Sequence, residues 1–263
     1  MKKLSLAVIL VLLTLHATAQ NNPVPFEENG KYGFKDPGGT IIVPPVYDIV
    51  SGFTEGLAAV KKGKKWGYVD LAGNEVIPFV YNNAYPFSEG LARVKKGSRF
   101  GFVDSTGKLV IKAIYSAASD FQNGVAFVMK NETEFISFGI FSGETFGFMG
   151  PSVNFQLGGS VRHSSDPGWL ISDVTTYKVR GLIDKTGKLI IPLKYRTIEK
   201  LTENLFKVQH PGYSRFGIFD TNKGKLIIPV KFGDIQLLPD GTFEAKSGKN
   251  KITLFKEDGT VIK

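Results

Sequence analysis

A block of residues that recurs along almost the whole chain constrains the fold more than any other feature. Each copy reads aromatic-Gly-apolar-apolar-Asp-x-x-Gly and then an apolar run, and the clearest copy extends from Trp66 to Pro78. The first glycine of the block recurs at spacings of 34, 34, 46, 34 and 36 residues, at Gly33, Gly67, Gly101, Gly147, Gly181 and Gly217. A period of this size indicates a repeat architecture, in which neighbouring copies bury a core that one copy cannot bury alone.

Within one copy the residues alternate as they do along a β-strand. In residues 65–70, one face carries the aromatic residues Trp66 and Tyr68. The other face carries Gly67 and Val69. This period of two predicts a half-buried strand with the same register in every copy. Because Gly weakens a strand, we expect its missing side chain to admit an aromatic ring from a neighbouring copy, in preference to a bulge.

The Asp-x-x-Gly sequence that follows predicts a turn. The Asp carboxylate can accept a hydrogen bond from the backbone two residues further on, and the Gly can adopt a positive φ. The turn aspartates are Asp36, Asp70, Asp104, Asp184 and Asp220. The returning strand usually reaches an Ile-Pro pair, and we expect Pro to end it because Pro cannot donate to the strand ladder.

A bend with a Tyr, a Phe-x-Glu-Gly-Leu-Ala sequence and a Lys-rich turn complete the copy. The clearest Phe-x-Glu-Gly-Leu-Ala segments are residues 53–58 and 87–92. The Lys-rich turns at residues 61–65 and 95–99 lead directly into the next aromatic-Gly strand. Each copy is therefore expected to form a β-meander of three to four short strands with polar turns.

The composite motif Lys-Trp-Gly-Tyr-Val-Asp-x-x-Gly-x-x-Val-Ile-Pro, followed by Phe-Ser-Glu-Gly-Leu-Ala-x-Val, resembles the WG (or KWG) repeat family. The resemblance covers residues 31–263 and is strongest over 31–128 and 181–229. It implies a β-rich, often exported bacterial repeat protein that serves as a binding scaffold, with no catalytic residues to carry over. The fourth copy departs from the pattern, since Gly150 replaces the turn aspartate and no Ile-Pro follows.

These patterns predict an all-β chain of tandem 34–36-residue β-meanders in an open, twisted β-solenoid or hairpin array, with a closed propeller-like ring as the alternative. The repeat domain is expected over residues 31–263, in seven units of which the fourth is degenerate, after an N-terminal lead at residues 20–30. The 46-residue spacing and a Phe-rich stretch predict a long hairpin insertion near residues 129–145. The last unit is partial, as terminal repeats often are because they cap the core.

The N-terminus has the layout of a secretory signal peptide. Lys2 and Lys3 are basic, residues 4–15 form an apolar run, and residues 17–19 read Ala-Thr-Ala. The apolar run is shorter than the roughly 20 residues that span a bilayer, so we expect cleavage after Ala19, with an uncleaved anchor as the alternative. The chain has no cysteine, which excludes disulfides and a lipoprotein anchor. A secreted, periplasmic or envelope protein with no integral membrane segment after cleavage is therefore expected.

No catalytic, cofactor or metal site is predicted, because the residues for such chemistry are scarce. The chain has three histidines, of which His16 belongs to the signal peptide. Ser, His and Asp lie next to one another around His163, whereas the members of a catalytic triad converge from distant segments. An enzyme site in the irregular residues 129–178 is the alternative, and it predicts a cleft in which His163 faces a carboxylate with a perturbed pKa.

Two surfaces are candidates for binding. The Lys-rich turns would form a basic ridge if they stack in register, which would suit a polyanion such as an acidic glycan or nucleic acid; otherwise they are solvated turns. The ridge residues are Lys61, Lys62, Lys64, Lys65, Lys95, Lys96 and Arg99. The second candidate is the irregular region 129–178, with His163 and Trp169, because recognition often lies where a regular array deviates.

The net charge of +9 falls to +7 when Lys2 and Lys3 are removed with the signal peptide. Excess Lys also protects strand edges and favours solubility, so the charge alone names no ligand. The favoured hypothesis is an exported, non-enzymatic repeat scaffold that binds an unknown protein or a cell-surface polymer. Polyanion binding through the Lys-rich turns is the alternative, and its affinity would fall steeply with salt.

Overall fold

In a computed structural model, the chain is described over residues 22–142, 145–148, 170–248 and 251–262. The regular secondary structure of these residues is entirely β-strand, in six small sheets numbered 1 to 6 in chain order. The predicted signal peptide at residues 1–19 lies outside the described residues. The chain divides into a first unit, residues 1–128 with 182–189, and a second unit, residues 129–181 with 190–263.

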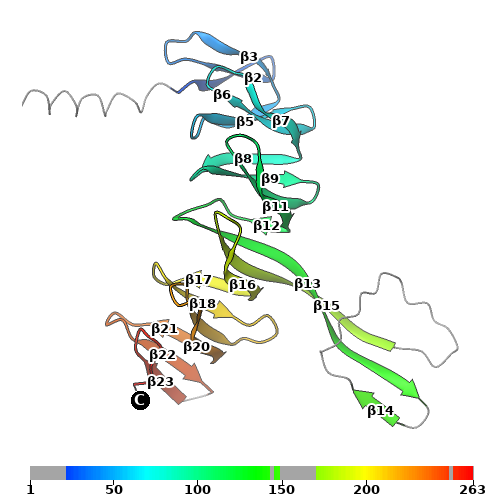
Figure 1. The fold of residues 1–263 in the computed structure, drawn as a ribbon, viewed down its shortest axis with the longest axis vertical. Coiled ribbons are helices and arrows are strands. Elements are labelled where there is room, and N and C mark those ends of the chain that lie inside the picture. The colour runs from blue at the N-terminus through cyan, green and yellow to red at the C-terminus, as the bar shows by residue number, and fades with distance from the viewer. Residues whose placement is uncertain (1–21, 143–144, 149–169, 249–250, 263) are drawn as a thin grey trace, which may run out of the picture. The chain divides into compact units, whose positions relative to one another are not determined.

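Sheets 1, 2 and 3 belong to the first unit, and in each of them consecutive strands pair as an antiparallel meander (Figure 1). Sheet 1 contains β1 (Val24–Glu28), β2 (Lys31–Lys35) and β3 (Ile41–Tyr47). Sheet 2 contains β4 (Ile49–Val50), β5 (Leu57–Lys62), β6 (Lys65–Asp70) and β7 (Glu75–Tyr81). Sheet 3 contains β8 (Asn83–Ser88), β9 (Leu91–Lys96), β10 (Arg99–Asp104) and β11 (Leu109–Tyr115).

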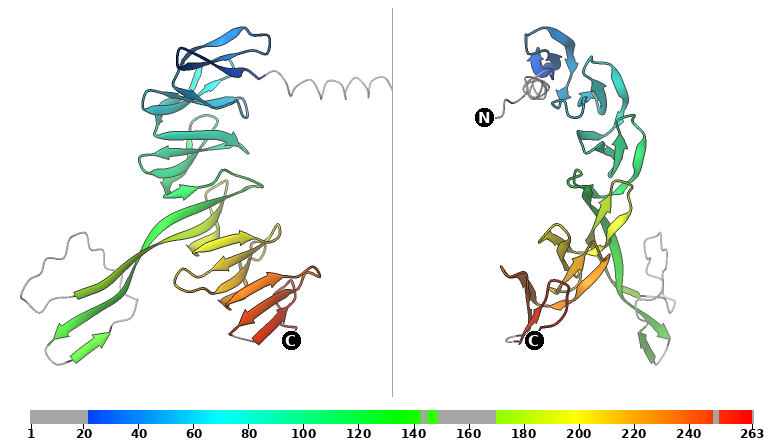
Figure 2. Two further views of the ribbon diagram at one scale, coloured as in Figure 1. Left: turned by 180° about the vertical axis from the view of Figure 1, so that it is seen from behind. Right: turned by 60° about the vertical axis from the view of Figure 1, so that its left-hand side comes forward.

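Sheet 4 differs from the others because two of its strands are much longer. Its order is β12 (Ala117–Ala118), β13 (Val125–Ser142), β15 (Leu170–Asp184) and β16 (Leu189–Tyr195). β14 (Thr145–Phe148) pairs with the far end of β13. β13 and β15 run side by side as a long twisted ribbon (Figure 2).

Sheets 5 and 6 belong to the second unit. Sheet 5 contains β17 (Thr197–Lys200), β18 (Leu205–Gln209), β19 (Phe216–Asp220) and β20 (Lys225–Phe232). Sheet 6 contains β21 (Asp234–Leu237), β22 (Phe243–Ser247) and β23 (Lys251–Phe255). A single bridge between Phe255 and Val261 stands where sheet 5 has its fourth strand. Thr253, which replaces the repeat glycine, lies in β23.

Seven units were expected, and the described residues form six sheets; most of the predicted fourth unit lies outside the described residues, so the number of units stays a prediction. Gly147 lies in β14, which pairs with β13. Gly181 lies in β15 beside β16, just as Gly67 lies in β6 beside β7. Residues 129–178 therefore stand in place of the short turn that joins β5 to β6 and β9 to β10. The insertion expected near residues 129–145 is the first part of this longer one.

The repeat glycine is required by a bulge, and the expected aromatic ring against its backbone is not the reason for it. The pairing of β6 with β7 shifts register on either side of Tyr68. A Cβ on Gly67 would lie 2.5 Å from the carbonyl oxygen of Ile77 in β7. The returning backbone comes equally close at Gly33, Gly101, Gly181 and Gly217. The strand pairing itself therefore excludes a side chain at this position.

The prolines lie inside the returning strands, so the expectation that they end these strands is wrong. Each of these strands is an edge strand of its sheet, namely β3, β7, β16 and β20 with Pro44, Pro78, Pro192 and Pro229. An edge strand has no second neighbour to receive its outward N–H groups. The missing N–H of Pro therefore removes no ladder hydrogen bond, and each strand continues to an aromatic residue, a Tyr in β3, β7 and β16 and Phe232 in β20.

The central strands are buried on both faces, although a half-buried strand was expected. In β6, Tyr68 and Val69 point to opposite faces and are both fully buried. Tyr68 belongs to an apolar cluster that sheet 2 shares with sheet 3. Val69 belongs to a cluster that sheet 2 shares with sheet 1. The stacking of consecutive sheets covers both faces, which the sequence of a single copy does not reveal.

Aromatic pairs at a constant sequence separation join the consecutive sheets of the first unit. The second member of two of these pairs is the Phe that opens a Phe-x-Glu-Gly-Leu-Ala segment. The pairs are Phe34–Phe53, Tyr68–Phe87 and Phe102–Phe121, with ring centroids 4.7, 5.1 and 4.9 Å apart. In each pair the partners are 19 residues apart, so one repeat supplies a ring to the sheet of the preceding repeat.

The predicted fold class is confirmed. The chain is an all-β array of tandem meander sheets, and the described residues form no closed barrel. Within the first unit, sheet 1 packs on sheet 2 and sheet 2 packs on sheet 3. The array is therefore open along the chain in this unit, as each sheet packs on the sheets that precede and follow it.

Candidate binding surfaces

Side-chain hydrogen bonds hold the two Lys-rich tips, defined as residues 61–65 and 95–99. The backbone N–H of Gly63 donates to Asp48 Oδ2 at 2.6 Å. The N–H of Gly97 donates to Asn82 Oδ1 at 2.8 Å. The two acceptors are 34 residues apart and each directly follows the buried Tyr of the bend. Each tip therefore has a fixed backbone at its centre.

The same acceptors connect each tip to the neighbouring repeat. Asn82 Oδ1 also accepts a hydrogen bond from Lys65 Nζ at 3.4 Å, so one amide contacts both Lys-rich tips. Asp48 forms an ion pair with Lys31, which holds the equivalent place in sheet 1. The two Lys-rich tips are therefore neighbours at one end of sheets 2 and 3.

The Lys-rich tips carry an excess of positive charge over the one carboxylate, that of Asp48, which anchors the first tip. Lys62, Lys64, Lys96 and Arg99 are exposed, and Lys61, Lys65 and Lys95 are partly exposed. In the part of the chain that the structure describes, none of these seven residues has a carboxylate within ion-pair distance. The seven residues predicted from the sequence are thus brought together on adjacent tips.

The turn aspartates of these sheets lie at the opposite ends of the strands. β6 begins at Lys65 and ends at Asp70, which separates the two ends by about 17 Å. Asp70 Oδ1 accepts hydrogen bonds from the N–H groups of Ala72 and Asn74 at 3.0 and 2.8 Å, and Gly73 has a φ of 85°. The motif predicts this turn geometry. The other turn aspartates also accept backbone hydrogen bonds, namely Asp36, Asp104, Asp184 and Asp220.

Two glutamates at this end join one repeat to the next. Glu55 Oε2 accepts a hydrogen bond from the N–H of Gly90 at 2.9 Å, and Glu89 Oε2 accepts one from the N–H of Gly124 at 2.8 Å. Both glutamates have positive φ values, 52° and 55°. The hydrogen bond from Gly124, together with the side chain of Lys185, lowers the pKa of Glu89. These carboxylates are therefore engaged far from the Lys-rich tips.

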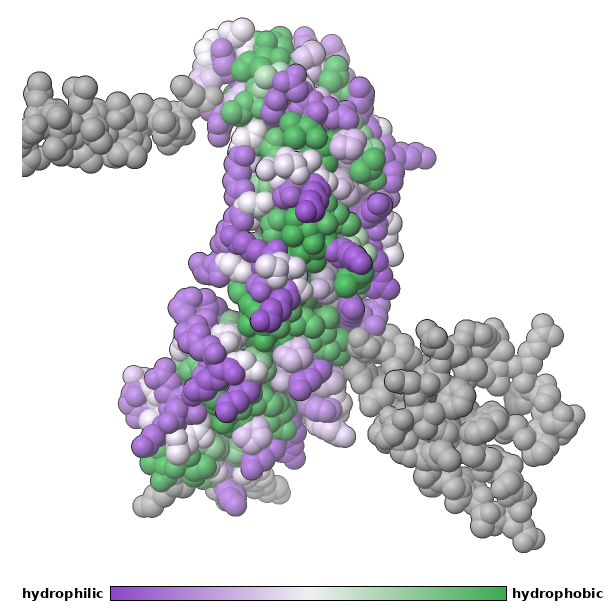
Figure 3. Space-filling model, in the orientation of Figure 1, coloured by the Kyte–Doolittle hydropathy of each residue, from purple (hydrophilic) through white to green (hydrophobic). Residues whose placement is uncertain are grey.

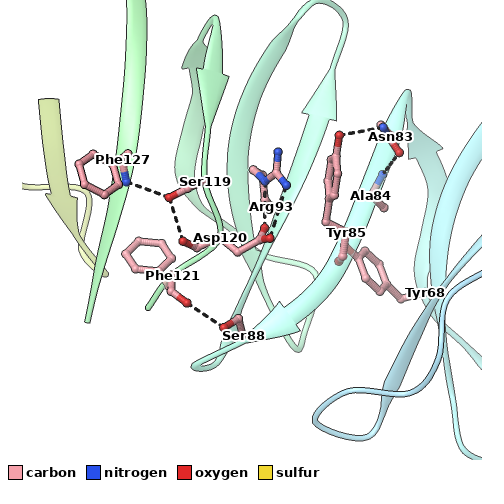
Figure 4. Close-up of polar contacts among 10 residues, drawn as sticks. All are labelled: Tyr68, Asn83, Ala84, Tyr85, Ser88, Arg93, Ser119, Asp120, Phe121 and Phe127. Atoms are coloured by element: carbon pink, nitrogen blue, oxygen red, sulfur yellow. Dashed lines mark hydrogen bonds and ion pairs between the residues drawn. The ribbon is translucent and has the colours of Figure 1, made fainter. Parts of the chain in front are cut away.

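Figure 4 shows a polar cluster between sheets 3 and 4 that the sequence did not reveal. Arg93 Nε lies 2.9 Å from Asp120 Oδ1, and its guanidinium carbon lies 3.6 Å from the ring centroid of Tyr85. Ser88 Oγ donates a hydrogen bond to the carbonyl oxygen of Phe121 at 2.8 Å. Most of the Arg93 side chain is buried, with 15% exposed. The charged groups of this cluster, on Arg93 and Asp120, bind each other. The cluster therefore links sheet 3 to sheet 4.

The second unit repeats this link with different residues. Lys207 Nζ lies 2.7 Å from Asp234 Oδ1 and 4.7 Å from the ring centroid of Phe216. The partners are 27 residues apart, as Arg93 and Asp120 are. The ion pair joins sheet 5 to sheet 6. The spacing that it shares with Arg93 and Asp120 was the one sequence signal for this link.

Exposed aliphatic side chains recur on the edge strands β3, β7 and β11 of the first unit. Two equivalent positions in each strand carry them, and these six residues are called the aliphatic rows. The first row is Ile42, Val76 and Val110, and the second is Val46, Val80 and Ile114, which are 36–47% exposed. Figure 3 shows hydrophobic side chains reaching the surface over the sheets, between polar ones. The sequence analysis did not single out these rows.

The second predicted surface, residues 129–178, falls partly outside the described residues. His163 and Trp169 both lie there, so the structure does not place them. At the tip that joins β18 to β19, the rings of His210 and Tyr213 stack with centroids 4.6 Å apart. Tyr213 is 65% exposed. This stacked pair is the most exposed aromatic feature of the described second unit.

The described residues show no group of three His, Asp or Glu side chains placed to hold a metal ion. They also contain no helix with the length and hydrophobicity of a membrane span. Among them, Tyr195 has a buried hydroxyl without a hydrogen-bond partner, and burial raises its pKa to about 12. This tyrosine ends β16 and packs against Phe219 of sheet 5, with ring centroids 6.5 Å apart, so it fills the apolar interior.

The profile of a family described as WG containing repeat matches residues 32–66, 66–99, 100–133 and 181–211. These matches cover just over half of the chain. The chain belongs to the WG repeat family. Each WG repeat begins at the aromatic-Gly strand of one sheet and ends near the tip of the next, so the repeats and the sheets are out of phase. Most of the 129–178 insertion lies outside the matched residues.

None of the curated proteins matches this WG repeat chain. Among solved structures, it is similar to Hsv2p of Kluyveromyces lactis, with 10% identity, a TM-score of 0.35, and coverage of 90% of this chain and 71% of that chain. A eukaryotic initiation factor gives 12% identity, a TM-score of 0.30, and coverage of 93% and 85%. PorZ, a surface component of the type-IX secretion system of Porphyromonas gingivalis, gives 12% identity, a TM-score of 0.28, and coverage of 91% and 40%.

Proposed function

We propose that this WG repeat protein is an exported, non-enzymatic scaffold that binds another macromolecule of the cell envelope, a protein or a surface polymer. The observation that carries the proposal is the pair of aliphatic rows on β3, β7 and β11. Six β-branched side chains are exposed at equivalent positions of successive sheets. Exposed apolar surface that recurs in this way is typical of interaction sites.

A partner at the aliphatic rows would contact side chains of the edge strands and would not pair with their backbone. An exposed edge strand can recruit a further strand, but Pro44 and Pro78 remove N–H groups from these edges and bulges distort the pairing. A partner would therefore contact the protruding methyl groups across several sheets. An extended partner fits such a surface better than a small molecule, which binds in a concave pocket.

The links between sheets support the role of a scaffold. In the first unit, ring pairs join each sheet to the next, and the carboxylates of Glu55 and Glu89 bond to the following repeat. Repeats coupled to their neighbours present equivalent surface groups at regular intervals. Export is supported by the basic, apolar and small-residue segments at the N-terminus.

The binding proposal is tested by photo-crosslinking in cells that produce the full-length chain. A photoreactive amino acid at Val80, in the second aliphatic row, is expected to give a discrete adduct with one envelope component. The matched control carries the same amino acid at Leu71, which is 41% exposed but lies outside the rows. The control is expected to give no such adduct.

Mass spectrometry then identifies the adduct as protein or polymer. Equal adducts at Val80 and Leu71, or none at Val80, would overturn binding through the aliphatic rows. The export part of the proposal is read from the N-terminus of the same protein. Mature protein that begins at Gln20 in the envelope fraction supports it, and intact protein that retains Met1 in the cytosol contradicts it.

A further inference from the structure

We infer that the Lys-rich tips of sheets 2 and 3 form a binding site for an acidic polysaccharide. The inference deepens the proposed function, and it rests on it only for the compartment in which the ligand is met. The site consists of residues 61–65 and 95–99 and is separate from the aliphatic rows. Charge, fixed geometry, spacing and the state of the nearby aromatic rings carry the argument.

The first step is the charge of the tips. Seven cationic residues lie on the two tips, and within the described residues none of them is paired with a carboxylate. The carboxylates of Asp70 and Asp104 lie at the other ends of β6 and β10, where backbone N–H groups bind them. Asp48 at the first tip offsets part of this charge, since its carboxylate pairs with Lys31 and interacts with Lys61. Seven cations against this one carboxylate leave the tips positively charged, and a polyanion would displace small counterions from them.

The second step is that the tip backbones are held in place. Asp48 and Asn82 each accept the N–H at the centre of a tip, from Gly63 and Gly97. Asn82 also accepts from Lys65 of the preceding tip. An anchored backbone lowers the entropy that is lost when the tip lysines bind a ligand, compared with a freely moving loop.

The third step is the spacing of the tips. Stacked sheets lie about 10 Å apart, so one small anion does not contact the equivalent residues Lys62 and Lys96 together, although Lys65 reaches across to Asn82 at the next tip. A ligand that uses both tips must carry anionic groups along an extended chain. The row of basic tips is short, since the tip of sheet 1 carries Glu27 and Glu28 and residues 129–178 replace the tip of sheet 4.

The fourth step separates a polysaccharide from a single-stranded nucleic acid. Nucleic-acid grooves usually combine basic residues with aromatic faces on which bases stack. Here cations already occupy faces of the nearby rings, with Lys95 Nζ 5.4 Å from the centroid of Phe100 and Arg93 over Tyr85. Trp66 packs against the apolar cluster of sheets 2 and 3. The rings therefore serve the fold, and the free groups that remain are cations suited to carboxylate or sulfate.

The test measures binding of the mature chain to polygalacturonate at low and moderate salt, with dextran as the neutral polymer. The tip variant carries Lys62→Gln, Lys64→Gln and Lys96→Gln, three exposed residues without acidic partners. The control variant carries Lys108→Gln, Lys112→Gln and Lys188→Gln, which are also exposed and remove the same net charge away from the tips. Unfolding midpoints confirm that both variants remain folded.

We expect polygalacturonate, but not dextran, to bind the mature chain and the control variant. The tip variant is expected to bind at least about 10-fold more weakly at low salt. It should also show a smaller slope of log affinity against log salt, because a complex with fewer ionic contacts releases fewer counterions when it forms. Equal loss in both variants would show a general charge effect and overturn the site. Tighter binding of a single-stranded oligodeoxythymidylate would overturn the polysaccharide in favour of nucleic acid.

The outcome can be separated from that of the proposed function. If the polysaccharide fails to bind but the Val80 adduct forms, the scaffold proposal stands and the tip site falls. If polygalacturonate binds through the tips but no Val80 adduct forms, the aliphatic rows are not the interaction surface and the tip site stands.

Discussion

At the scale of single residues, Gly67 and Pro78 are two halves of one feature. The bulge in β7 brings the carbonyl oxygen of Ile77 over Gly67, so the residue in β6 can have no side chain. The same stretch of β7 lies at the sheet edge, so Pro78 loses no ladder hydrogen bond there. The recurring aromatic-Gly and Ile-Pro pairs are therefore complementary parts of the same distortion, one on each strand.

The change Gly67→Ala tests this account. The new Cβ would lie 2.5 Å from the oxygen of Ile77 and 3.1 Å from the carbonyl carbon of Pro78, both of them backbone atoms that cannot rotate away. We expect the free energy of unfolding to fall by about 1–3 kcal/mol. Gly52→Ala is the control, because nothing lies within 4 Å of its added Cβ, and it should change stability by less than about 0.5 kcal/mol. Urea unfolding curves that place the two variants together would contradict the bulge explanation.

At the scale of strands and sheets, the interface between consecutive sheets is the stabilising unit. A sheet of three or four short strands is marginal until its faces are covered. In the first unit, one repeat covers the preceding sheet with its aromatic ring, as Phe53 covers Phe34, and binds the following repeat through a Glu carboxylate, as Glu55 binds Gly90. The Phe-x-Glu-Gly-Leu-Ala segment thus supplies an apolar and a polar contact within three residues.

Phe87→Ala should show how much one such interface contributes. Phe87 is 4% exposed and packs edge-on against Tyr68, with ring centroids 5.1 Å apart. Removing the ring leaves a cavity between sheets 2 and 3, and we expect a loss of about 3–5 kcal/mol. Ile114→Ala, at a side chain that is 44% exposed, is the control and should cost much less. A similar small loss for both variants in urea titrations would mean that the ring pair does not hold the sheets together.

Several elements could be predicted from the sequence because their signals are local. The period predicted the meander sheets, and each Asp-x-x-Gly predicted its own turn. The extent of the insertion could not be predicted, because β13 pairs with β15, a strand that lies far from it in the sequence. The cations of the Lys-rich tips were evident from composition, but their anchors were not. Asp48 and Asn82 bind backbone N–H groups 15 residues away, and a backbone donor leaves no mark in the sequence.

At the scale of the whole chain, carboxylates and tyrosines set opposite limits on the pH range of stability. A side-chain hydrogen bond from Asn74 lowers the pKa of Asp70, and one from Thr106 lowers the pKa of Asp104. Burial raises the pKa of the bend tyrosines, including Tyr81 and Tyr195, the latter to about 12. A lowered carboxyl pKa contributes stability above the unfolded value, and a raised phenol pKa contributes stability below it.

The pH profile of the free energy of unfolding should therefore be flat from about pH 5 to about pH 9. It should fall below about pH 4, as the turn carboxylates are protonated, and above about pH 10, as the unfolded chain gains from tyrosine ionisation. Tyr195→Phe should lose less stability between pH 10 and pH 12 and should be more stable at pH 7, because its hydroxyl is buried without a partner. Urea midpoints across this range measure both effects, and an unchanged alkaline limb in Tyr195→Phe would contradict the assignment.

The replacement of one tip by residues 129–178 has a practical consequence. Sheet 4 keeps its pairing of β13, β15 and β16 around this insertion. The entropic cost of closing a loop rises only slowly with the length of the loop. The tips at Gly63 and Gly97 have the same place in their own sheets, so foreign segments should be accepted there with the sheets intact. Two epitopes or enzyme-capture peptides grafted at these tips would be displayed side by side. The chain would thus serve as a scaffold for peptide display, in which the same insert can be placed at either tip.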